Sequence, residues 1–273
     1  MERKILLIND MAGYGKVALS AMIPIFSRMN YETFCLPTAL ISNTLSYGDF
    51  KILDTTEYME GTIQVWERLG FEFPAVCTGY IASEKQADLV NRYCRKLKEK
   101  GSVVIVDPIM ADDGVFYNGI SEKIVHGMRK LCSVAEVILP NMTEACFLAG
   151  TDYRDQFSKD GVKKLTDSLL DLGPRNVIIT SCRIDGQTCT VVRTSGDTDL
   201  RILRCHLIPA SFPGTGDIFT SIVAGDYLQG RNLTDSAGEA MKLIEKLIAA
   251  NQKNIDKDAG IPVEYYLDLI QRL

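Results

Sequence analysis

The chain has 273 residues, a formal net charge of −5 and a sequence pI near 5.2. An acidic chain has no surplus of basic side chains to neutralise phosphates, so we expect no nucleic-acid partner. The sequence has no apolar run long enough to span a membrane and no signal-peptide pattern at Met1, so we expect a cytoplasmic protein without membrane contact. Its eight cysteines form no C-x-x-C pair and it has two histidines, which favours reduced thiols and a carboxylate as any general base.

Short apolar runs alternate along the chain with longer segments of helical periodicity. In chain order, we predict strand 5–8, helix 16–28, strand 33–41, helix 50–69, strand 75–80, helix 84–100, strand 103–106, helix 121–131, strand 137–139, helix 143–148, helix 159–172, strand 177–181, strands 188–194 and 200–207 as a hairpin, and helices 217–229, 233–251 and 264–273. This alternation predicts an α/β fold of three layers, with a mostly parallel central sheet and helices on both faces. No linker or repeat interrupts the pattern, so we predict one domain over residues 1–273.

Several polar side chains directly follow predicted strands. They are Tyr80, Asp107, Asn141, Thr180 and Ser181. Ligands of parallel sheets bind outside the carboxyl ends of the strands, so the pattern predicts that these side chains share one rim.

A glycine-rich segment, Pro213 to Asp217, runs into an apolar helical stretch. Backbone N–H groups that lack partners at the start of a helix can bind an anion. A carboxylate at Asp217 could accept a proton from a hydroxyl group that attacks a phosphoryl group. The spacing alone also fits an ordinary turn with Asp217 as a helix cap.

Six stretches in order along the chain resemble those of pyridoxal kinases, the vitamin B6 kinases of the ribokinase superfamily. They are Tyr14-Gly15 with Ser20-Ala21, Thr78 to Ser83, Val106 to Asp112, Leu139 to Ala145, Ile178 to Ser181, and Gly214 to Asp217. The resemblance implies a ribokinase-like fold, transfer of phosphate from ATP with Mg²⁺ to a B6 vitamer, and a homodimer.

The resemblance also implies roles for single residues. Asp217 would be the catalytic base, and it would also contact the substrate. The backbone of Gly214, Thr215 and Gly216 would hold the transferring phosphate. Asp112 would bind Mg²⁺, and Glu144 would act on the metal and its water shell. The nucleotide phosphates would be lined by Asp107, Asn141, Glu144, Thr180 and Ser181. The stretch 112–119 looks flexible and would form the lid over ATP and substrate.

The substrate end departs from the commonest pyridoxal kinase pattern. Asp10 stands where a substrate-binding serine is usual, while Asn43 and Tyr80 are retained as expected substrate contacts. A carboxylate at position 10 suits a cation, either a protonated pyridine nitrogen or the ammonium group of pyridoxamine. A strand-end aspartate that bonds to backbone N–H groups is the alternative. Leu139 replaces a threonine, which leaves the need for a monovalent cation open.

Three other functions compete with a B6 kinase. Hydroxymethylpyrimidine kinases share much of the pattern, but a cysteine commonly replaces the aspartate that Asp217 supplies here. A non-catalytic B6-binding pseudo-kinase would not need an intact Asp217, Asp112 and Glu144. Nucleoside and sugar kinases usually insert a β lid early in the chain, and residues 10–50 leave no room for one. The sequence does not rank pyridoxal, pyridoxamine and pyridoxine.

Overall fold

The computed structural model describes residues 3–206 and 208–270, and the chain divides into two compact units. Unit 1 combines Met1–Tyr80 with Leu207–Leu273, and unit 2 is Ile81–His206. The prediction of a single domain remains a prediction. Among the described residues, no helix is long and apolar enough to cross a membrane.

The strands of unit 1 form a sheet in the order β4-β1-β2-β3. The strands are β1 (Lys4–Tyr14), β2 (Glu32–Asn43), β3 (Ile52–Asp54) and β4 (Ala75–Thr78). β1 runs parallel to β2 and β4, and β3 pairs antiparallel with β2. Residues Ile5 to Ile8 of β1 are fully buried, which explains why this run is apolar without alternation. The register between β1 and β2 shifts between Asn9 and Met11, so a β-bulge lies beside Asp10.

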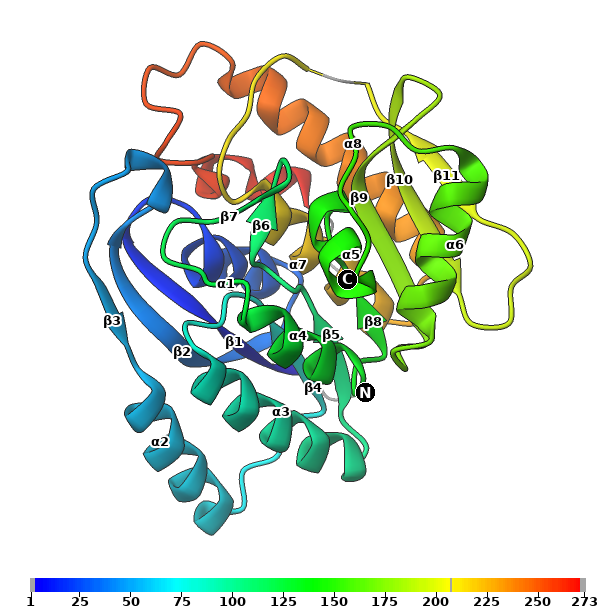
Figure 1. Cartoon of the computed structure of the whole chain (residues 1–273). Helices are drawn as coiled ribbons and strands as arrows, with labels where there is room; N and C mark the ends of the chain where they lie inside the picture. Colours follow the sequence, from blue (N-terminus) through cyan, green and yellow to red (C-terminus); the bar gives the residue numbers. More distant parts are fainter. Residues whose placement is uncertain (1–2, 207, 271–273) are drawn as a thin grey trace. The chain divides into compact units, whose positions relative to one another are not determined.

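The helices of unit 1 come from both ends of the chain. They are α1 (Ala18–Arg28), η1 (Leu45–Tyr47), α2 (Thr56–Leu69), α7 (Thr215–Leu228), α8 (Leu233–Asn251) and η2 (Val263–Leu269). α1 packs on β1 and β2 and also contacts α7, which lies beside α8 (Figure 1). This packing brings the start of α7 to the carboxyl end of β1, although about 200 residues separate them in the sequence.

The strands of unit 2 follow the order β11-β10-β9-β8-β5, and β6 and β7 form a small separate hairpin. Its elements are α3 (Glu84–Glu99), β5 (Val103–Val106), β6 (Ala111–Asp112), β7 (Val115–Phe116), α4 (Ile124–Cys132), β8 (Val137–Ile138), α5 (Met142–Ala149), α6 (Lys159–Leu170), β9 (Asn176–Ile184), β10 (Gln187–Thr194) and β11 (Arg201–Arg204). β5, β8 and β9 are parallel, and β9, β10 and β11 are antiparallel. The predicted hairpin of the last two strands is therefore confirmed.

Two predicted helices differ from the structure. The predicted helix 50–69 begins with a strand, β3, and α2 starts only at Thr56. Asp54 separates the two elements, because its Oδ1 accepts hydrogen bonds from the N–H and the hydroxyl group of Thr56. The predicted terminal helix 264–273 is the 3₁₀-helix η2, and residues 271–273 lie outside the described part of the chain.

Two tight hairpins also differ from the sequence expectation. Asp113-Gly114 joins β6 to β7, and Asp185-Gly186 joins β9 to β10. All four residues have positive φ angles, as a two-residue type I′ turn requires. The stretch 112–119, which looks flexible in the sequence and is expected to form a lid, begins as a regular hairpin.

Candidate active site

Asp217 is the third residue of α7 and is buried. Its Oδ2 accepts a hydrogen bond from the backbone N–H of Ala18 at 2.8 Å, and its Oδ1 accepts one from Nδ2 of Asn9 at 3.2 Å. Burial raises the pKa of Asp217 to about 6, and these two hydrogen bonds oppose the rise. The carboxylate is therefore mostly ionised at pH 7, yet it accepts a proton more readily than an exposed aspartate does.

The two glycines before Asp217 differ in their surroundings. Gly214 has a φ of 84°, and a methyl group there would lie 2.3 Å from the carbonyl oxygen of Lys16. A methyl group at Gly216 would meet no atom within 4 Å. Gly214 supplies no side-chain cap to α7, and the hydroxyl group of Thr215 donates to the carbonyl oxygen of Phe212 at 3.2 Å. The start of α7 can therefore present its N–H groups to an anion.

Asp10, on β1, is 6% exposed and lies close enough to Asp217 for the two charges to interact. Burial, and then the charge of Asp217, raise the pKa of Asp10 to about 7. A carboxyl group of this kind is half ionised at neutral pH and is stabilised as the anion by an incoming cation. The geometry thus suits the cation contact that the sequence predicts at this position.

Tyr80 joins this group, whereas Asn43 does not. Tyr80 is buried, and burial together with the charges of Asp10 and Asp54 raises the pKa of its hydroxyl group to about 12. Asn43 pairs with Tyr14, four residues beyond Asp10 on β1, which is roughly 13 Å along a strand. Its amide donates to the carbonyl oxygens of Thr44 and Asp49 and so braces the loop after β2.

In unit 2, Asn141 and Glu144 form a capping box at the start of α5. Oδ1 of Asn141 accepts from the N–H of Glu144 at 2.9 Å, and Oε2 of Glu144 accepts from the N–H of Asn141 at 2.8 Å. Oε1 of Glu144 accepts from the N–H of Met110 at 3.0 Å, while Nδ2 of Asn141 donates to the carbonyl oxygen of Ala111 at 2.7 Å. The two side chains therefore fix the segment that leads into the β6–β7 hairpin.

Three further predicted nucleotide residues lie around this capping box. Asp107 is buried, and after burial its charge is the largest cause that raises the pKa of Glu144. Thr180 bridges to Asn141 across the sheet, and its N–H donates to the carbonyl oxygen of Pro140 at 3.0 Å. Ser181 has a positive φ of 56°, at the point where the register of β9 shifts. The structure thus gathers Asp107, Asn141, Glu144 and Thr180 at one place in unit 2.

Asp112, the predicted magnesium contact, is exposed on the β6–β7 hairpin. Its Oδ1 accepts from the N–H of Asp113 at 3.0 Å, and the N–H of Gly114 donates to the hydroxyl group of Thr143 on α5 at 3.0 Å. Within residues 3–206 and 208–270, no three His, Cys, Asp or Glu side chains are grouped closely enough to hold a metal ion by themselves. A magnesium ion needs few protein carboxylates, because it keeps several waters and binds substrate phosphates.

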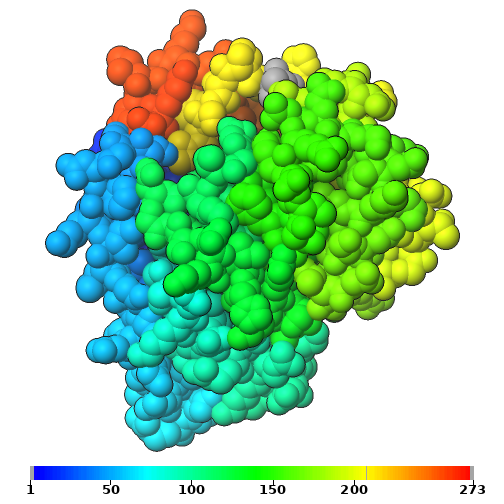
Figure 2. Space-filling model, viewed as in Figure 1, coloured from blue at the N-terminus to red at the C-terminus, as the bar shows by residue number. Residues whose placement is uncertain are grey.

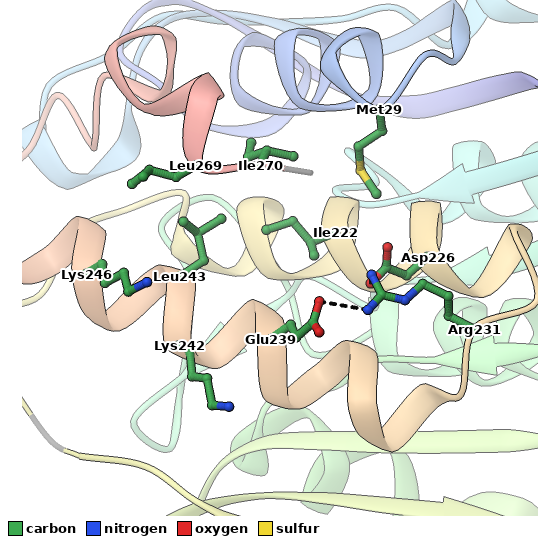
Figure 3. Close-up of a pocket in the computed structure, with 10 residues that line it drawn as sticks. All are labelled: Met29, Ile222, Asp226, Arg231, Glu239, Lys242, Leu243, Lys246, Leu269 and Ile270. Carbon is green, nitrogen blue, oxygen red and sulfur yellow. Dashed lines mark ion pairs between the residues drawn. The ribbon is translucent and has the colours of Figure 1, made fainter. Parts of the chain in front are cut away.

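A cavity of about 180 Å³ in unit 1 contains none of these residues. Figure 3 shows its lining, in which Arg231 pairs with Glu239. The cavity lies against α7, α8 and the end of η2, and its polar wall includes the ion pair between Arg231 and Asp226. Its lining has no polar side chain that the sequence connects with phosphate transfer.

Two residues of the Asp217 site were not predicted from the sequence. They are Asn9 and Ala18, which hold the two carboxylate oxygens of Asp217. Ala18 has a φ of 47°, a conformation that alanine rarely adopts. One signal was available for Asn9, since an amide that follows a buried apolar strand needs hydrogen-bond partners.

Comparison with known proteins agrees with this reading of the fold. The family model described as phosphomethylpyrimidine kinase matches residues 20–263. A Corynebacterium diphtheriae pyridoxal kinase is 24% identical over 92% of each chain. A Bacteroides thetaiotaomicron protein described as a phosphomethylpyrimidine kinase, solved with pyridoxal, has a TM-score of 0.94 and 32% identity, covering 100% of this chain and 97% of its own. Pyridoxal kinase from Lactobacillus plantarum has a TM-score of 0.88 and 25% identity, covering 99% and 97%.

The fold and its relatives thus define a small-molecule kinase with a ribokinase-like α/β fold. The chain belongs to the phosphomethylpyrimidine kinase family. Its curated relatives include pyridoxal kinases. The predicted fold class, a mostly parallel sheet with helices around it, is confirmed, and so is the predicted kinase of the vitamin B6 family.

Proposed function

We propose that the protein transfers the γ-phosphate of ATP, with Mg²⁺, to the 5′-hydroxymethyl group of pyridoxal, pyridoxamine or pyridoxine. One observation carries the proposal: a buried carboxylate, Asp217, lies directly behind the glycines that open α7 and is held at both oxygens. A kinase needs a group at this place that takes the hydroxyl proton, beside donors that take the phosphate charge.

In the proposed reaction, Asp217 accepts the proton of the vitamer hydroxyl group while its oxygen attacks the γ-phosphorus. The bond between the γ-phosphorus and the bridging oxygen breaks, so that ADP leaves with the electron pair. The backbone N–H groups of Gly214, Thr215 and Gly216 stabilise the charge on the transferring group. The proton stays on Asp217 and returns to solvent after the vitamer phosphate leaves.

We propose that unit 2 holds the nucleotide and the metal. Asp107, Asn141, Thr180 and Ser181 would contact the nucleotide phosphates, and Glu144 supports them by fixing the residues around Met110. Asp112 offers the hard carboxylate oxygen that Mg²⁺ prefers. Glu144, whose Oε1 accepts from the N–H groups of Met110 and Ala111 just before Asp112, would act on the waters of the metal. Mg²⁺ would neutralise phosphate charge there. The β6–β7 hairpin would be part of the lid.

We propose that Asp10, beside Tyr80, binds the cationic part of the vitamer, and the variant Asp10→Ser tests which part this is. A charge-assisted hydrogen bond contributes about 1.5–3 kcal/mol, or roughly tenfold and more in affinity. If Asp10 faces the ammonium group, the variant lowers kcat/KM for pyridoxamine about tenfold more than for pyridoxal. An equal loss for all three vitamers would place Asp10 at the pyridine nitrogen, and no loss would leave it a structural residue.

The family description names a phosphomethylpyrimidine, which makes the related hydroxymethylpyrimidine a second candidate substrate. One assay separates the candidates, which is Mg-ATP turnover with the three B6 vitamers and with hydroxymethylpyrimidine, each measured as ADP release. We expect the highest kcat/KM with a B6 vitamer. Turnover confined to the pyrimidine would overturn the B6 proposal, and no turnover with any of the four would support a non-catalytic binder.

We also propose a homodimer, as the family resemblance implies. β3 is the edge strand of the unit 1 sheet, and with α2 it exposes large apolar side chains (Leu53 60%, Tyr58 63% and Leu69 62%). Figure 2 shows the segment around residues 50–70 at the surface. Light scattering after size-exclusion chromatography should give a molar mass twice that of one chain. The variant Leu53→Glu should lower this mass to that of a single chain.

A further inference from the structure

Asn9 is a fully buried amide at the end of the apolar run of β1. Its Oδ1 accepts hydrogen bonds from the backbone N–H of Asp10 at 3.0 Å and of Tyr80 at 2.8 Å. Its Nδ2 donates to Oδ1 of Asp217 at 3.2 Å and contacts the sulfur of Met22 at 3.3 Å. One side chain therefore connects the two strands, β1 and β4, with the first turn of α7.

The orientation of this amide is determined by its partners. Two backbone N–H groups point at one end of the amide, and only its oxygen can accept them. The NH₂ group must then face Asp217. The amide packs directly against the backbone of Gly79, since a methyl group there would lie 2.4 Å from its Nδ2. Gly79 thus fits the backbone closely against the amide, which explains a glycine directly after β4.

We propose that Asn9 is a positioning residue for phosphate transfer, which keeps the Asp217 carboxylate ionised and aimed between α1 and α7. The inference rests on the proposed role of Asp217 as the base. A buried carboxylate loses the solvation of its charge, and a donor whose orientation is fixed by its partners replaces part of it. With the N–H of Ala18 on the other oxygen, each oxygen keeps a lone pair for the substrate proton.

The groups that face Asp217 from the surrounding elements are few. Asp10 on β1 is the titratable group whose own pKa responds to Asp217. From the start of α1 the facing group is the backbone N–H of Ala18, and Lys16, just before it, directs its ammonium group to Glu264. Asn9 is therefore the side chain that can offset the burial of Asp217, as its effect on the pKa of that carboxyl group indicates.

The variant Asn9→Asp tests this with little change of shape. Its first oxygen still accepts from Asp10 and Tyr80, and only the group that faces Asp217 changes, from a donor to a carboxylate. We expect the acid limb of the kcat/KM–pH profile to move upward by roughly one pH unit or more, because like charges at this distance raise a pKa strongly. At pH 6, kcat/KM should then fall about tenfold relative to its plateau value.

Asn176→Asp is the matched control. Asn176 is also buried in a sheet, and its amide donates to the carbonyl oxygen of Glu136 and accepts from the hydroxyl group of Thr194. This variant should lower Tm without moving the acid limb. Asn9→Ser, a smaller side chain, provides a second variant if Asn9→Asp does not fold, and it should move the limb in the same direction.

The outcomes separate the inference from the function on which it rests. An acid limb that stays in place in Asn9→Asp or Asn9→Ser, while Asp217→Asn is inactive, overturns the role of Asn9 and leaves Asp217 as the base. Full turnover in Asp217→Asn overturns the base itself. The variant Asp10→Asn shows which residue causes the acid limb. If the limb belongs to Asp217, it should move to lower pH, because a neighbouring charge is gone. If the limb disappears, it belongs to Asp10, which contradicts the inference.

Discussion

Each of the two units places a buried carboxylate at the third residue of a helix, but the helix starts are used in opposite ways. In unit 2, Asn141 caps α5 with its side chain and Glu144 returns to the N–H of Asn141. In unit 1, α7 begins at Gly214, which has no side chain to cap it, and Asp217 turns instead toward Asn9 and Ala18. The first helix start has a side-chain cap for its N–H groups, and the second has none.

This difference teaches what a helix start contributes to a phosphate-transfer site. In a capping box the carboxylate accepts hydrogen bonds from the backbone, so Glu144 stabilises the local fold. A glycine start keeps the N–H groups and the positive end of the dipole open, so that a carboxylate there must be held from elsewhere in the chain. In this protein it is held by the first 18 residues, which explains the tight contact between the segments before α1 and α7.

The largest expected effect is on Asp217. Asp217→Asn keeps the shape of the side chain but cannot accept the hydroxyl proton, so kcat should fall by roughly 10² to 10⁴ fold. Steady-state turnover with saturating Mg-ATP and pyridoxal measures this, and calorimetry should show unchanged ATP binding. Turnover within a few fold of the unaltered protein would mean that the open helix start holds no catalytic base.

The second effect concerns stability and Asp10. Its pKa is raised from 3.8 to about 7, so the folded state binds more protons than the unfolded state between these pH values. Stability contributed by Asp10 is therefore present below about pH 4, falls as the pH rises to about 7, and is then constant. The difference between the two pKa values corresponds to a loss of at most about 4 kcal/mol in the free energy of unfolding.

Asp10→Asn should remove this loss. Its free energy of unfolding should exceed that of the unaltered protein most at pH 8 and least at pH 4, as urea titrations at both pH values can measure. Asp49→Asn, an exposed change in the same unit, is the control and should leave the pH dependence as it is. A variant that is equally less stable at both pH values would show that Asp10 is a structural residue, not a strained binding group.

Glu144 provides the contrasting case in unit 2. Glu144→Gln replaces one acceptor oxygen by an NH₂ group that faces a backbone N–H, at Asn141 or Met110. The cost should be about 1–3 kcal/mol, measured as a lower Tm by calorimetry. Glu99→Gln, at an exposed position on α3, should change stability by about 0.5 kcal/mol or less. A stable but inactive Glu144→Gln would instead favour the predicted role of Glu144 at the metal and its waters.

The sequence predicted the alternation of strands and helices because buried strands such as β1 carry continuous apolar runs and surface helices such as α3 have a polar face. It also predicted helices that start near Asp217 and near Asn141, since both residues lie in short motifs that fix local geometry, while the roles of these residues stay predictions. It did not predict Asn9 and Ala18 as partners of Asp217, because those hydrogen bonds join residues about 200 positions apart. The family resemblance placed Asn43 with Asp10 at the substrate, whereas the register of β1 and β2 separates the two residues.

The smallest expected effect separates the two glycines of the open helix start. At Gly216 a methyl group has free space and a helical backbone, so Gly216→Ala should raise stability by about 0.4–1 kcal/mol. At Gly214 the methyl group would meet the carbonyl oxygen of Lys16, so Gly214→Ala should lower Tm.

If the phosphate approaches the N–H of Gly216, Gly216→Ala should also lower kcat although it folds more stably, because the added methyl group lies where the anion binds. Calorimetry and turnover on the same preparations test both statements. Unchanged kcat in Gly216→Ala would move the anion site away from Gly216, and an equally stable Gly214→Ala would mean that the segment before α1 is not pressed against the start of α7.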